Sequence, residues 1–473
     1  MRVAFFASEV FPYAKTGGLA DVCGSLPLAL EKLGVKVIIF LPRYRVIDPN
    51  RFGLKRLNNH VWTATLGKDI QVFFLEEEKF FDRDGLYGDA AGDYPDNLER
   101  FQYYCAKSLD IIKQLNLKID LVHCHDWQTA LIAPYLKFLH GRDPFYAGIK
   151  SILTIHNLAY QGIFPKEKYP KLGLEERLFS PEGFEFYNQI NFLKAGIMYN
   201  DVLTTVSNTY AKDIKTERLG CGLDGVLRSR KEEIVGILNG IDEDTWNPAI
   251  DLYIKSKYSP ADDLAKKYIN KADLQQISKL LVSTDVPLFG FVGRLSHQKG
   301  IDLIFDAMED LLKMDLQVVF KGVGDGKYYP LLKNLATKYP KKFALHVTFD
   351  EKLAHQVYAG SDIFLMPSVY EPCGLSQMIS LKYGTVPLVY HTGGLIDTVQ
   401  PYEQGGNGFV FKDYTVKDFI KTVKTAIEVY HNKSKFNELV ANAFQCHFSW
   451  TESAKQYLAL YEGVAAQKEA VES

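Results

Sequence analysis

The sequence predicts an α/β protein with two parallel-sheet halves. Short apolar, β-branched runs alternate with helix-length amphipathic segments, which is the pattern of repeated βαβ units. Most of these runs are hydrophobic throughout, as expected for strands that are buried on both faces. The length of 473 residues agrees with more than one domain, because domains average roughly 150 residues.

The expected strands fall into two groups along the chain. In the first half they cover residues 3–7, 35–40, 120–123, 151–155, 202–206 and 234–238. In the second half they cover residues 288–292, 317–320, 345–348, 363–366 and 386–390. A turn and a polar stretch separate the halves, so we place the boundary near residue 245, with domains 1–245 and 246–473. The helical stretch 451–466 fits either domain, because its periodicity does not identify its partner.

Charge and composition exclude several classes of protein. Lys plus Arg total 55 and Asp plus Glu total 57, so the formal net charge is −2 and the basic excess of a dedicated nucleic-acid binder is missing. A local basic pocket for an anionic substrate is still compatible with this balance. No segment approaches the roughly 18 uninterrupted apolar residues of a membrane span. We therefore expect neither a nucleic-acid nor a membrane partner.

The six cysteines indicate a reduced protein. No two of them have a C-x-x-C spacing, and six in a chain of this length do not form a disulfide scaffold. The apolar run at the N-terminus is too short for a signal peptide. We therefore expect a cytoplasmic protein.

Candidate site residues follow the expected strands, because parallel α/β sheets bind ligands at the carboxyl ends of their strands. After the first strand, Lys15 precedes the pair Gly17-Gly18, which permits close backbone approach to an anion at a helix N-terminus. Asp21 would add a hydrogen-bond acceptor. An ordinary glycine turn is the alternative. The loop is not a G-x-G-x-x-G fingerprint and no acidic residue follows the second strand, so a nicotinamide-dinucleotide site is disfavoured.

Two more strands of the first half end in polar residues. The run 123–127, His-Cys-His-Asp-Trp, has an H-x-H pattern that metal sites also show, but no further ligand spacing completes such a site. One of its two histidines is expected to be structural. Asp126 and Trp127 are better suited to hydrogen-bonding and stacking a sugar. His156 follows the next strand; a lone histidine is more often structural than catalytic, but its place beside two other polar strand ends weakens the structural interpretation.

The second half has a cationic loop and an isolated carboxylate. Arg294 and Lys299 follow its first strand, where two cations suit a diphosphate and a solvated charged loop is the alternative. Glu371 stands between a strand end and a helix start, where it can accept hydrogen bonds from sugar hydroxyls while the helix N-terminus favours phosphate. The pair Gly393-Gly394 mirrors Gly17-Gly18, and two such turns would bind a phosphate-bearing ligand between the halves.

In combination, the motifs Lys-Thr-Gly-Gly-Leu-Ala-Asp at 15–21 and Glu-Pro-Cys-Gly-Leu at 371–375 resemble those of the glycogen/starch synthase family. The similarity runs from Val3 to about Tyr461. It implies two Rossmann-like domains that face each other across a deep interdomain cleft, the GT-B architecture. It also implies transfer of glucose from ADP-glucose to the non-reducing-end 4-hydroxyl of an α-1,4-glucan, with retention of the anomeric configuration.

The resemblance assigns roles to residues by matching position. It implies that Lys15 and the glycine loop contact the donor phosphate and glucose, and that the two cations of the second half hold the diphosphate. The implied catalytic residues are Glu371, His156, Arg294, Lys299 and Asp126. The implied substrate-binding residues are Lys15, Gly17, Gly18, Asp21, Tyr94, Asn239, Phe349, Cys373, Gly374, Leu375, Thr392, Gly393 and Gly394.

Several of these roles are more specific. His156 and Asn239 would hydrogen-bond the transferred glucose, and Glu371 its 3- and 4-hydroxyl region. Phe349 takes the position of an aromatic ring under the adenine, where related sequences often have tyrosine. Asp126 and Tyr94 would lie toward the acceptor glucan. Backbone N–H groups would be presented by Gly374, Leu375, Gly393 and Gly394. The wider retaining class often has a second glutamate eight residues after the first, but this chain has Ile379 there and Gln377 nearby, as in the synthase subgroup.

The implied chemistry uses no metal and no cofactor. No D-x-D metal motif is convincingly placed, so Arg294 and Lys299 would supply the positive charge for the departing ADP. Retention without a well-placed nucleophile favours front-face attack, with Glu371 as a covalent nucleophile the less favoured variant. The expected partners are ADP-glucose and an α-1,4-glucan; no protein partner can be inferred. A UDP-glucose-dependent enzyme of the same fold and a non-catalytic glucan-binding protein are the alternatives.

Overall fold

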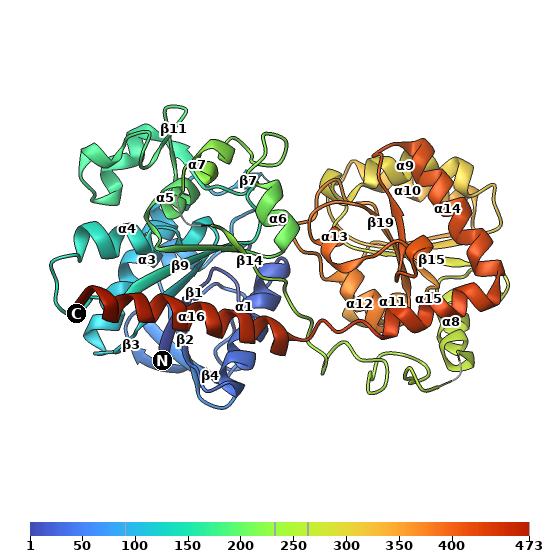
Figure 1. Cartoon of the computed structure of the whole chain (residues 1–473), viewed down its shortest axis with the longest axis horizontal. Coiled ribbons are helices and arrows are strands. Elements are labelled where there is room, and N and C mark those ends of the chain that lie inside the picture. Colours follow the sequence, from blue (N-terminus) through green and yellow to red (C-terminus); the bar gives the residue numbers. More distant parts are fainter. Residues whose placement is uncertain (90, 231–232, 263, 473) are drawn as a thin grey trace. The chain divides into compact units, whose positions relative to one another are not determined.

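The computed structural model describes residues 1–89, 91–230, 233–262 and 264–472, which form two compact units (Figure 1). The first unit comprises Met1–Gly240 and Trp450–Ser473, and the second comprises Ile241–Ser449. The chain therefore leaves the first unit at Gly240, ahead of the expected boundary near residue 245. The reason is that Ile241 already pairs with the end of the second unit, where its N–H donates to the carbonyl of Phe448 at 2.8 Å.

The first unit is built on a nine-stranded sheet with the order β14-β13-β9-β8-β1-β2-β5-β4-β3. Its parallel strands are β1 (Arg2–Phe6), β2 (Lys36–Pro42), β5 (Ile70–Leu75), β8 (Leu121–His125), β9 (Lys150–Ile155), β13 (Val202–Thr205) and β14 (Val235–Gly236). The strands β4 (Val61–Leu66) and β3 (Lys55–Asn58) extend it in antiparallel fashion. All six strands expected in this half are present, and β3, β4 and β5 are additional.

Helices cover this sheet, and the same unit contains a separate small sheet. The longer helices are α1 (Gly18–Lys32), α3 (Asn97–Gln114), α5 (Phe192–Tyr199) and α16 (Trp450–Glu472). The shorter ones are α2 (Glu78–Phe81), α4 (Ile132–Pro134), α6 (Asn208–Asp213) and α7 (Asp224–Ser229). The small sheet has the order β10-β12-β11, with β10 (Ile163–Pro165), β11 (Glu185–Phe186) and β12 (Gln189–Asn191). Of the two placements left open for the C-terminal helix, the structure shows one: α16 packs along α1 (Figure 1).

The second unit has a six-stranded, fully parallel sheet with the order β17-β16-β15-β18-β19-β20. The strands are β15 (Leu288–Val292), β16 (Gln317–Lys321), β17 (Phe343–His346), β18 (Ile363–Met366), β19 (Val386–Tyr390) and β20 (Phe409–Phe411). The helices are α8 (Ala265–Ile277), α9 (Ile301–Leu311), α10 (Tyr328–Lys338), α11 (Glu351–Gly360), α12 (Ser376–Lys382), α13 (Gly394–Thr398), α14 (Val416–His431) and α15 (Lys433–Phe444). Counted along the chain this strand order is 3-2-1-4-5-6, the doubly wound order of the Rossmann fold.

One strand lies earlier in the sequence than expected. β17 covers Phe343–His346, whereas residues 345–348 were expected. The side chain of Phe343 is buried in the core, whereas Val347 is 41% exposed, so packing favours the earlier register. β20 was not expected because three residues are too few to show a periodic pattern.

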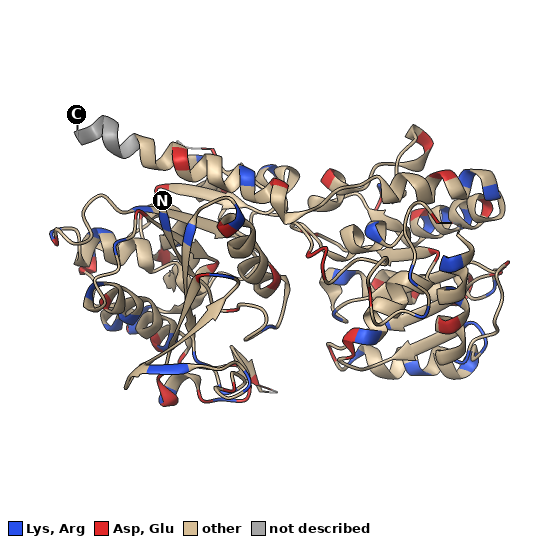
Figure 2. Cartoon of the chain, turned by 90° about the horizontal axis from the view of Figure 1, so that it is seen from below, with Lys and Arg blue, Asp and Glu red and all other residues tan. Residues whose placement is uncertain are grey.

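Charged side chains are distributed over both units. Figure 2 shows acidic and basic residues interspersed along the helices and loops of each unit, in agreement with the net charge of −2. Among the described residues, no helix is both long and apolar enough to cross a bilayer.

Candidate active site

Each of the two sheets has a switch point at which the strand order reverses, and in each unit some of the predicted site residues follow the strands at that point. In the first unit β1 lies between β2 and β8, so the loops after β1 and β8 leave the sheet on either side of the switch. In the second unit the corresponding strands are β15 and β18. Open α/β sheets bind ligands in the crevice at this position, because neighbouring loops turn away in opposite directions. The loops after these four strands carry Gly17, Asp126, Lys299 and Glu371.

In the first unit, a buried glutamate that was not predicted organises the glycine loop. Glu9 accepts hydrogen bonds from the Thr16 hydroxyl at 2.6 Å, from the Gly17 N–H at 3.2 Å and from the Thr16 N–H. The Tyr87 hydroxyl donates to the same carboxylate at 2.7 Å. Glu9 is only 3% exposed, so these contacts compensate for the loss of hydration of its charge. The N–H of Gly17, expected to bind the ligand, is thus bound to Glu9 in this structure.

Lys15 and Asp21 pair with each other at the rim of this loop. Lys15 Nζ lies 2.6 Å from Asp21 Oδ1, and the Lys15 side chain is 46% exposed. A pair this exposed stabilises the fold by little, so its members are available to exchange partners.

Tyr94 contacts two arginines and the backbone of its own loop. The guanidinium groups of Arg83 and Arg100 lie 4.8 and 5.0 Å from the centroid of its ring. The N–H of Gly85 donates to its hydroxyl at 3.2 Å. These contacts give Tyr94 a structural role in its own loop, and its predicted role toward an acceptor stays a prediction.

Asp126 holds the backbone that carries His156. Its Oδ1 accepts the N–H of His156 at 2.7 Å, which ties the loop after β8 to the loop after β9. Its backbone is strained, because a φ of 57° is unusual for a residue with a side chain. Burial raises the pKa of Asp126 to about 7, although the N–H groups of His156 and Asn157 act in the opposite direction. A strained, buried carboxylate of this kind is typical of a functional site.

Three imidazoles lie in a row behind Asp126. His125 Nδ1 lies 2.9 Å from His156 Nε2. The ring of His123 is 4.2 Å from that of His125 and is itself held by the Tyr461 hydroxyl at 2.7 Å and the Thr154 hydroxyl at 2.6 Å. Burial lowers the pKa of His123 and of His156 to about 3 and that of His125 well below its usual range, so all three are neutral at pH 7.

The contacts of His123 show which role it has in this row of histidines. In the described part of the chain, no group of three or more His, Cys, Asp or Glu side chains has the arrangement of a metal site. The nitrogens of His123 both hydrogen-bond to hydroxyl groups, which identifies it as the structural member of the H-x-H pair.

In the second unit, the predicted cation and carboxylate form a direct ion pair. Lys299 Nζ lies 2.6 Å from Glu371 Oε2, and the Ser368 hydroxyl donates to the same oxygen at 2.9 Å. The Glu371 side chain is 7% exposed and that of Lys299 is 25% exposed. Gly300 makes the approach possible, because a Cβ there would lie 2.0 Å from the carbonyl of Pro367 at the end of β18. The two loops of the switch point are therefore joined through the residues expected to be catalytic.

The second glycine pair packs directly on the Glu371 loop. A Cβ on Gly393 would lie 2.1 Å from the carbonyl of Glu371, and a Cβ on Gly394 would lie 2.4 Å from the carbonyl of Cys373. The N–H of Gly394 donates to the carbonyl of Glu371 at 2.9 Å. The Gly394 N–H, which was expected to face the ligand, thus binds the Glu371 carbonyl in this structure, and the turn supports Glu371 because only glycine fits against that backbone.

Gln377 closes the loop that contains Cys373 and Gly374. Its Nε2 donates to the carbonyls of these two residues at 2.9 and 3.0 Å. Thr392 and Cys373 are buried, at 6% and 4% exposure, so each supports the loops more than it presents a side chain. The helix α12 begins at Ser376, which carries no charge.

Three further predicted residues lie on segments that directly follow strands of the two sheets. Phe349 follows β17 and is 93% exposed, an unusual position for so large an apolar ring. Arg294 is exposed on the loop after β15. Asn239 is buried after β14, and among the described residues its Oδ1 has no hydrogen-bond partner.

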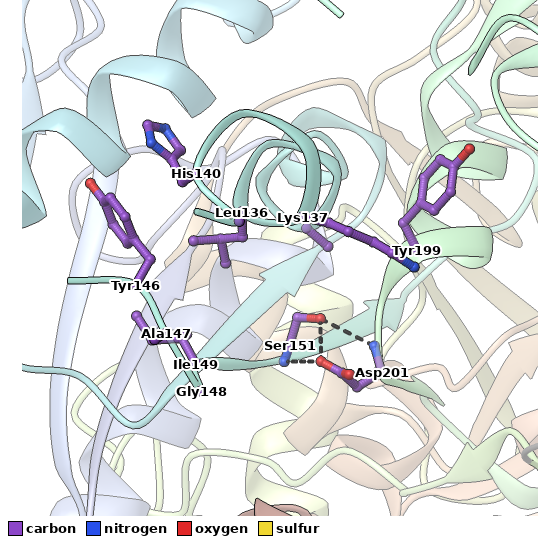
Figure 3. A pocket seen from close by; sticks show the side chains of 12 residues that line it. Leu136, Lys137, His140, Tyr146, Ala147, Gly148, Ile149, Ser151, Tyr199 and Asp201 are labelled. Atoms are coloured by element: carbon purple, nitrogen blue, oxygen red, sulfur yellow. Dashed lines mark hydrogen bonds between the residues drawn. The ribbon is translucent and has the colours of Figure 1, made fainter. Parts of the chain in front are cut away.

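A cavity in the first unit lies away from these loops (Figure 3). It has a volume of about 310 Å³ and borders the first residues of β9, whereas His156 follows the last residue of that strand. Three of the polar side chains that line it have partners: Asp201 accepts from the N–H of Ser151 at 2.8 Å and from its hydroxyl at 2.9 Å, and the Tyr146 hydroxyl donates to the carbonyl of Leu109 at 2.7 Å. The cavity is therefore not the site that the strand ends define.

Comparison with known proteins first defines the class. Residues 2–229 match the model described as starch synthase catalytic domain, and residues 273–443 match the model described as glycosyl transferases group 1. The sucrose-phosphate synthase of Thermosynechococcus elongatus shares the fold, with a TM-score of 0.62, 17% identity, and coverage of 98% of this chain and 99% of that one. The protein is a glycosyltransferase of the GT-B fold.

More similar proteins identify the family. The glycogen synthase of Thermodesulfovibrio yellowstonii is 42% identical over 99% of each chain, and that of Pseudothermotoga lettingae is 44% identical over 99% of this chain and 100% of its own. The catalytic domain of starch synthase IV from Arabidopsis thaliana, solved with ADP and acarbose, has a TM-score of 0.91 and 33% identity over 98% of this chain and 99% of that one. The chain belongs to the glycogen/starch synthase family and is a glucosyltransferase, which confirms the predicted class and activity.

Proposed function

We propose that the enzyme transfers glucose from ADP-glucose to the 4-hydroxyl at the non-reducing end of an α-1,4-glucan, with retention of configuration. The observation that carries the proposal is the Lys299–Glu371 pair at the switch point of the second unit, with 2.6 Å between Nζ and Oε2. A nucleotide-sugar donor needs both groups side by side: a cation for its phosphates and a carboxylate for its sugar hydroxyls. The solved relative with ADP and acarbose supports the same ligand classes.

The leaving group would be stabilised by Lys299 and Arg294. Departure of ADP places negative charge on the β-phosphate, and a cation fixed nearby lowers the energy of that transition state. Loss of one such preorganised contact costs about 3 kcal/mol, or a factor of roughly 10²–10³ in turnover. Lys15 would add a third cation, since its pair with Asp21 is exposed enough to exchange for a phosphate.

The transferred glucose would be held by Glu371, His156 and Asn239. Both hydrogen bonds to the Glu371 carboxylate involve Oε2, which leaves Oε1 to accept from the 3- and 4-hydroxyls. The unpartnered Oδ1 of Asn239 would accept from another hydroxyl of the sugar, which would satisfy a buried polar atom. The N–H groups of Gly374, Leu375 and Gly393 would complete this part of the site.

The remaining contacts would be made by Phe349 and Asp126. Phe349 would stack on adenine, because a ring that is 93% exposed gains by being covered. Asp126, with Tyr94 further out, would lie toward the acceptor glucan. Asp126 also fixes the His156 backbone, so its loss would disturb both substrates.

The mechanism would be front-face substitution without a metal. Glu371 is poorly placed to act as a nucleophile, because Lys299 and Ser368 both bind one of its oxygens and reduce its electron density. The leaving phosphate would instead accept the proton of the acceptor hydroxyl. We place the enzyme in the cytoplasm, where its six free cysteines would remain reduced.

The test is an assay with glycogen, a chelator and either ADP-glucose or UDP-glucose, with nucleotide release and glucan growth as readouts. We expect growth with ADP-glucose that chelator does not reduce. Faster growth with UDP-glucose would overturn the donor assignment. Restoration of lost activity by added Mg²⁺ would overturn the metal-free mechanism. Absence of growth with either donor would contradict the proposed reaction.

A further inference from the structure

The contact between His125 and His156 requires a defined proton position. His125 Nδ1 and His156 Nε2 are 2.9 Å apart, so one nitrogen donates and the other accepts. A neutral imidazole carries one N–H, on either of its nitrogens. Two arrangements are therefore possible: the proton between the rings belongs to His125 Nδ1, or it belongs to His156 Nε2.

The other ring nitrogen of His125, Nε2, shows which of these two proton arrangements is favoured. His125 Nε2 is buried, and the described residues provide it with no hydrogen-bond partner. If His156 Nε2 carried the shared proton, the proton of His125 would be on this Nε2, as a buried N–H without an acceptor. If His125 Nδ1 carries it, Nε2 holds only an unused lone pair. Buried N–H groups without partners are rarer in proteins than unsatisfied acceptors, so the arrangement with the shared proton on His125 Nδ1 is favoured.

We infer that His125 is a positioning residue that donates its Nδ1 proton to His156 Nε2 and thereby holds the proton of His156 on Nδ1. The inference rests on the proposed function for the role of His156 toward glucose. Among the described residues, Nδ1 of His156 has no hydrogen-bond partner, and the residue is half-buried. His156 therefore offers the sugar an N–H donor. It contacts a sugar oxygen as a donor and does not act as a base.

The surroundings of His125 keep its ring in place. Its backbone N–H donates to the Thr129 hydroxyl at 2.7 Å, and that hydroxyl donates back to the His125 carbonyl at 2.9 Å. The rings of Phe5 and His123 lie 5.2 and 4.2 Å from its own. Burial keeps both His125 and His156 neutral, which excludes a doubly protonated ring in the pair.

The direct test is a long-range ¹H–¹⁵N correlation spectrum of the ligand-free enzyme labelled with ¹⁵N-histidine, with His156 assigned by a His156→Gln variant. We expect the His156 pattern of a ring protonated at Nδ1. A pattern protonated at Nε2 would overturn the inference. This readout needs no substrate, so it remains decisive even if the proposed contact between His156 and glucose fails.

Variants of His125 test its positioning role. His125→Asn keeps an N–H donor near the position of Nδ1, whereas His125→Gln and His125→Phe do not. We expect kcat to fall roughly tenfold to a hundredfold in His125→Gln and His125→Phe, with the donor KM nearly unchanged. This is the range expected when a buried group loses its hydrogen-bond partner. In His125→Asn we expect kcat to be largely restored. The matched control is Tyr461→Phe, which removes a bond to His123 and should leave the His156 spectrum unchanged. Equal losses in all three His125 variants would indicate packing alone and overturn the positioning role.

Discussion

At the scale of single residues, Glu371 is held by both its side chain and its backbone. Its carboxylate binds Lys299 and Ser368, and its carbonyl accepts the N–H of Gly394. We expect Glu371→Ala to reduce kcat by roughly 10²–10³-fold or more, because it removes a preorganised acceptor and leaves Lys299 without its counter-ion. The measurement is steady-state glucan growth, with circular dichroism to confirm folding. Turnover like that of the wild type in a folded variant would contradict the assigned role.

From the raised pKa of Asp126 we expect an unusual dependence of folding stability on pH. Burial raises its pKa from 3.8 to about 7 in the folded protein, so the folded state binds its proton more tightly than the unfolded chain does. Its contribution to stability is therefore full below about pH 4 and is lost as the pH rises through 7, a change on the order of 4 kcal/mol.

The matched measurement compares Asp126→Asn with the wild type by urea denaturation between pH 4.5 and 8. Asparagine does not titrate, so the variant should gain in relative stability as the pH rises, while its activity falls. Asp201→Asn is the control, since Asp201 is exposed and lies at the other end of the sheet. Parallel stability curves for Asp126→Asn and the wild type would exclude a raised pKa.

At the scale of elements, the turn before α13 determines where Glu371 lies. A methyl group on Gly394 would collide with the backbone of Cys373, which has no flexible atom to move away. We expect Gly394→Ala to destabilise the second unit by about 1–3 kcal/mol, the usual cost of overpacking, and to lower kcat as well. Gly326→Ala is the control, because a Cβ there has open space. The measurements are thermal unfolding and steady-state kinetics of both variants. Equal stability and equal kcat in the two variants would show that the close packing at Gly394 is unimportant.

The strands and loops also show how much of the fold and of the candidate site could be predicted from the sequence. Strands such as β18 and β19 are continuous apolar runs and were found from local pattern alone. Glu9 was missed although it also follows a strand, because the tyrosine that binds it is 78 residues away. The pairing of His125 with His156 spans 31 residues, and the packing of Gly394 depends on another loop. Local pattern thus predicts where strands end, and tertiary contacts decide which of the polar groups there act together.

At the scale of the whole molecule, the chain crosses to the second unit once and returns, so the first unit is completed by the last helix, α16. This helix buries Ala454, Tyr457, Tyr461 and Val464, and it packs along α1. The hydroxyl of Tyr461 reaches His123 on β8, the strand that leads to Asp126. A segment more than 300 residues from β8 in sequence therefore supports the switch point of the first unit, and it should contribute to that unit alone.

Truncation after Ser449 tests this arrangement. Burying a large apolar side chain contributes about 1.5–3 kcal/mol, so loss of α16 should destabilise the first unit by several kcal/mol. Hydrogen exchange should become faster in β8, which α16 contacts through Tyr461 and His123, and should stay unchanged in β18 and β19 of the second unit. Tyr461→Phe, which keeps the packing and removes only the hydroxyl, should change exchange little. Equal acceleration in both units of the truncated chain would mean that the two units unfold as one, against the division that the contacts define.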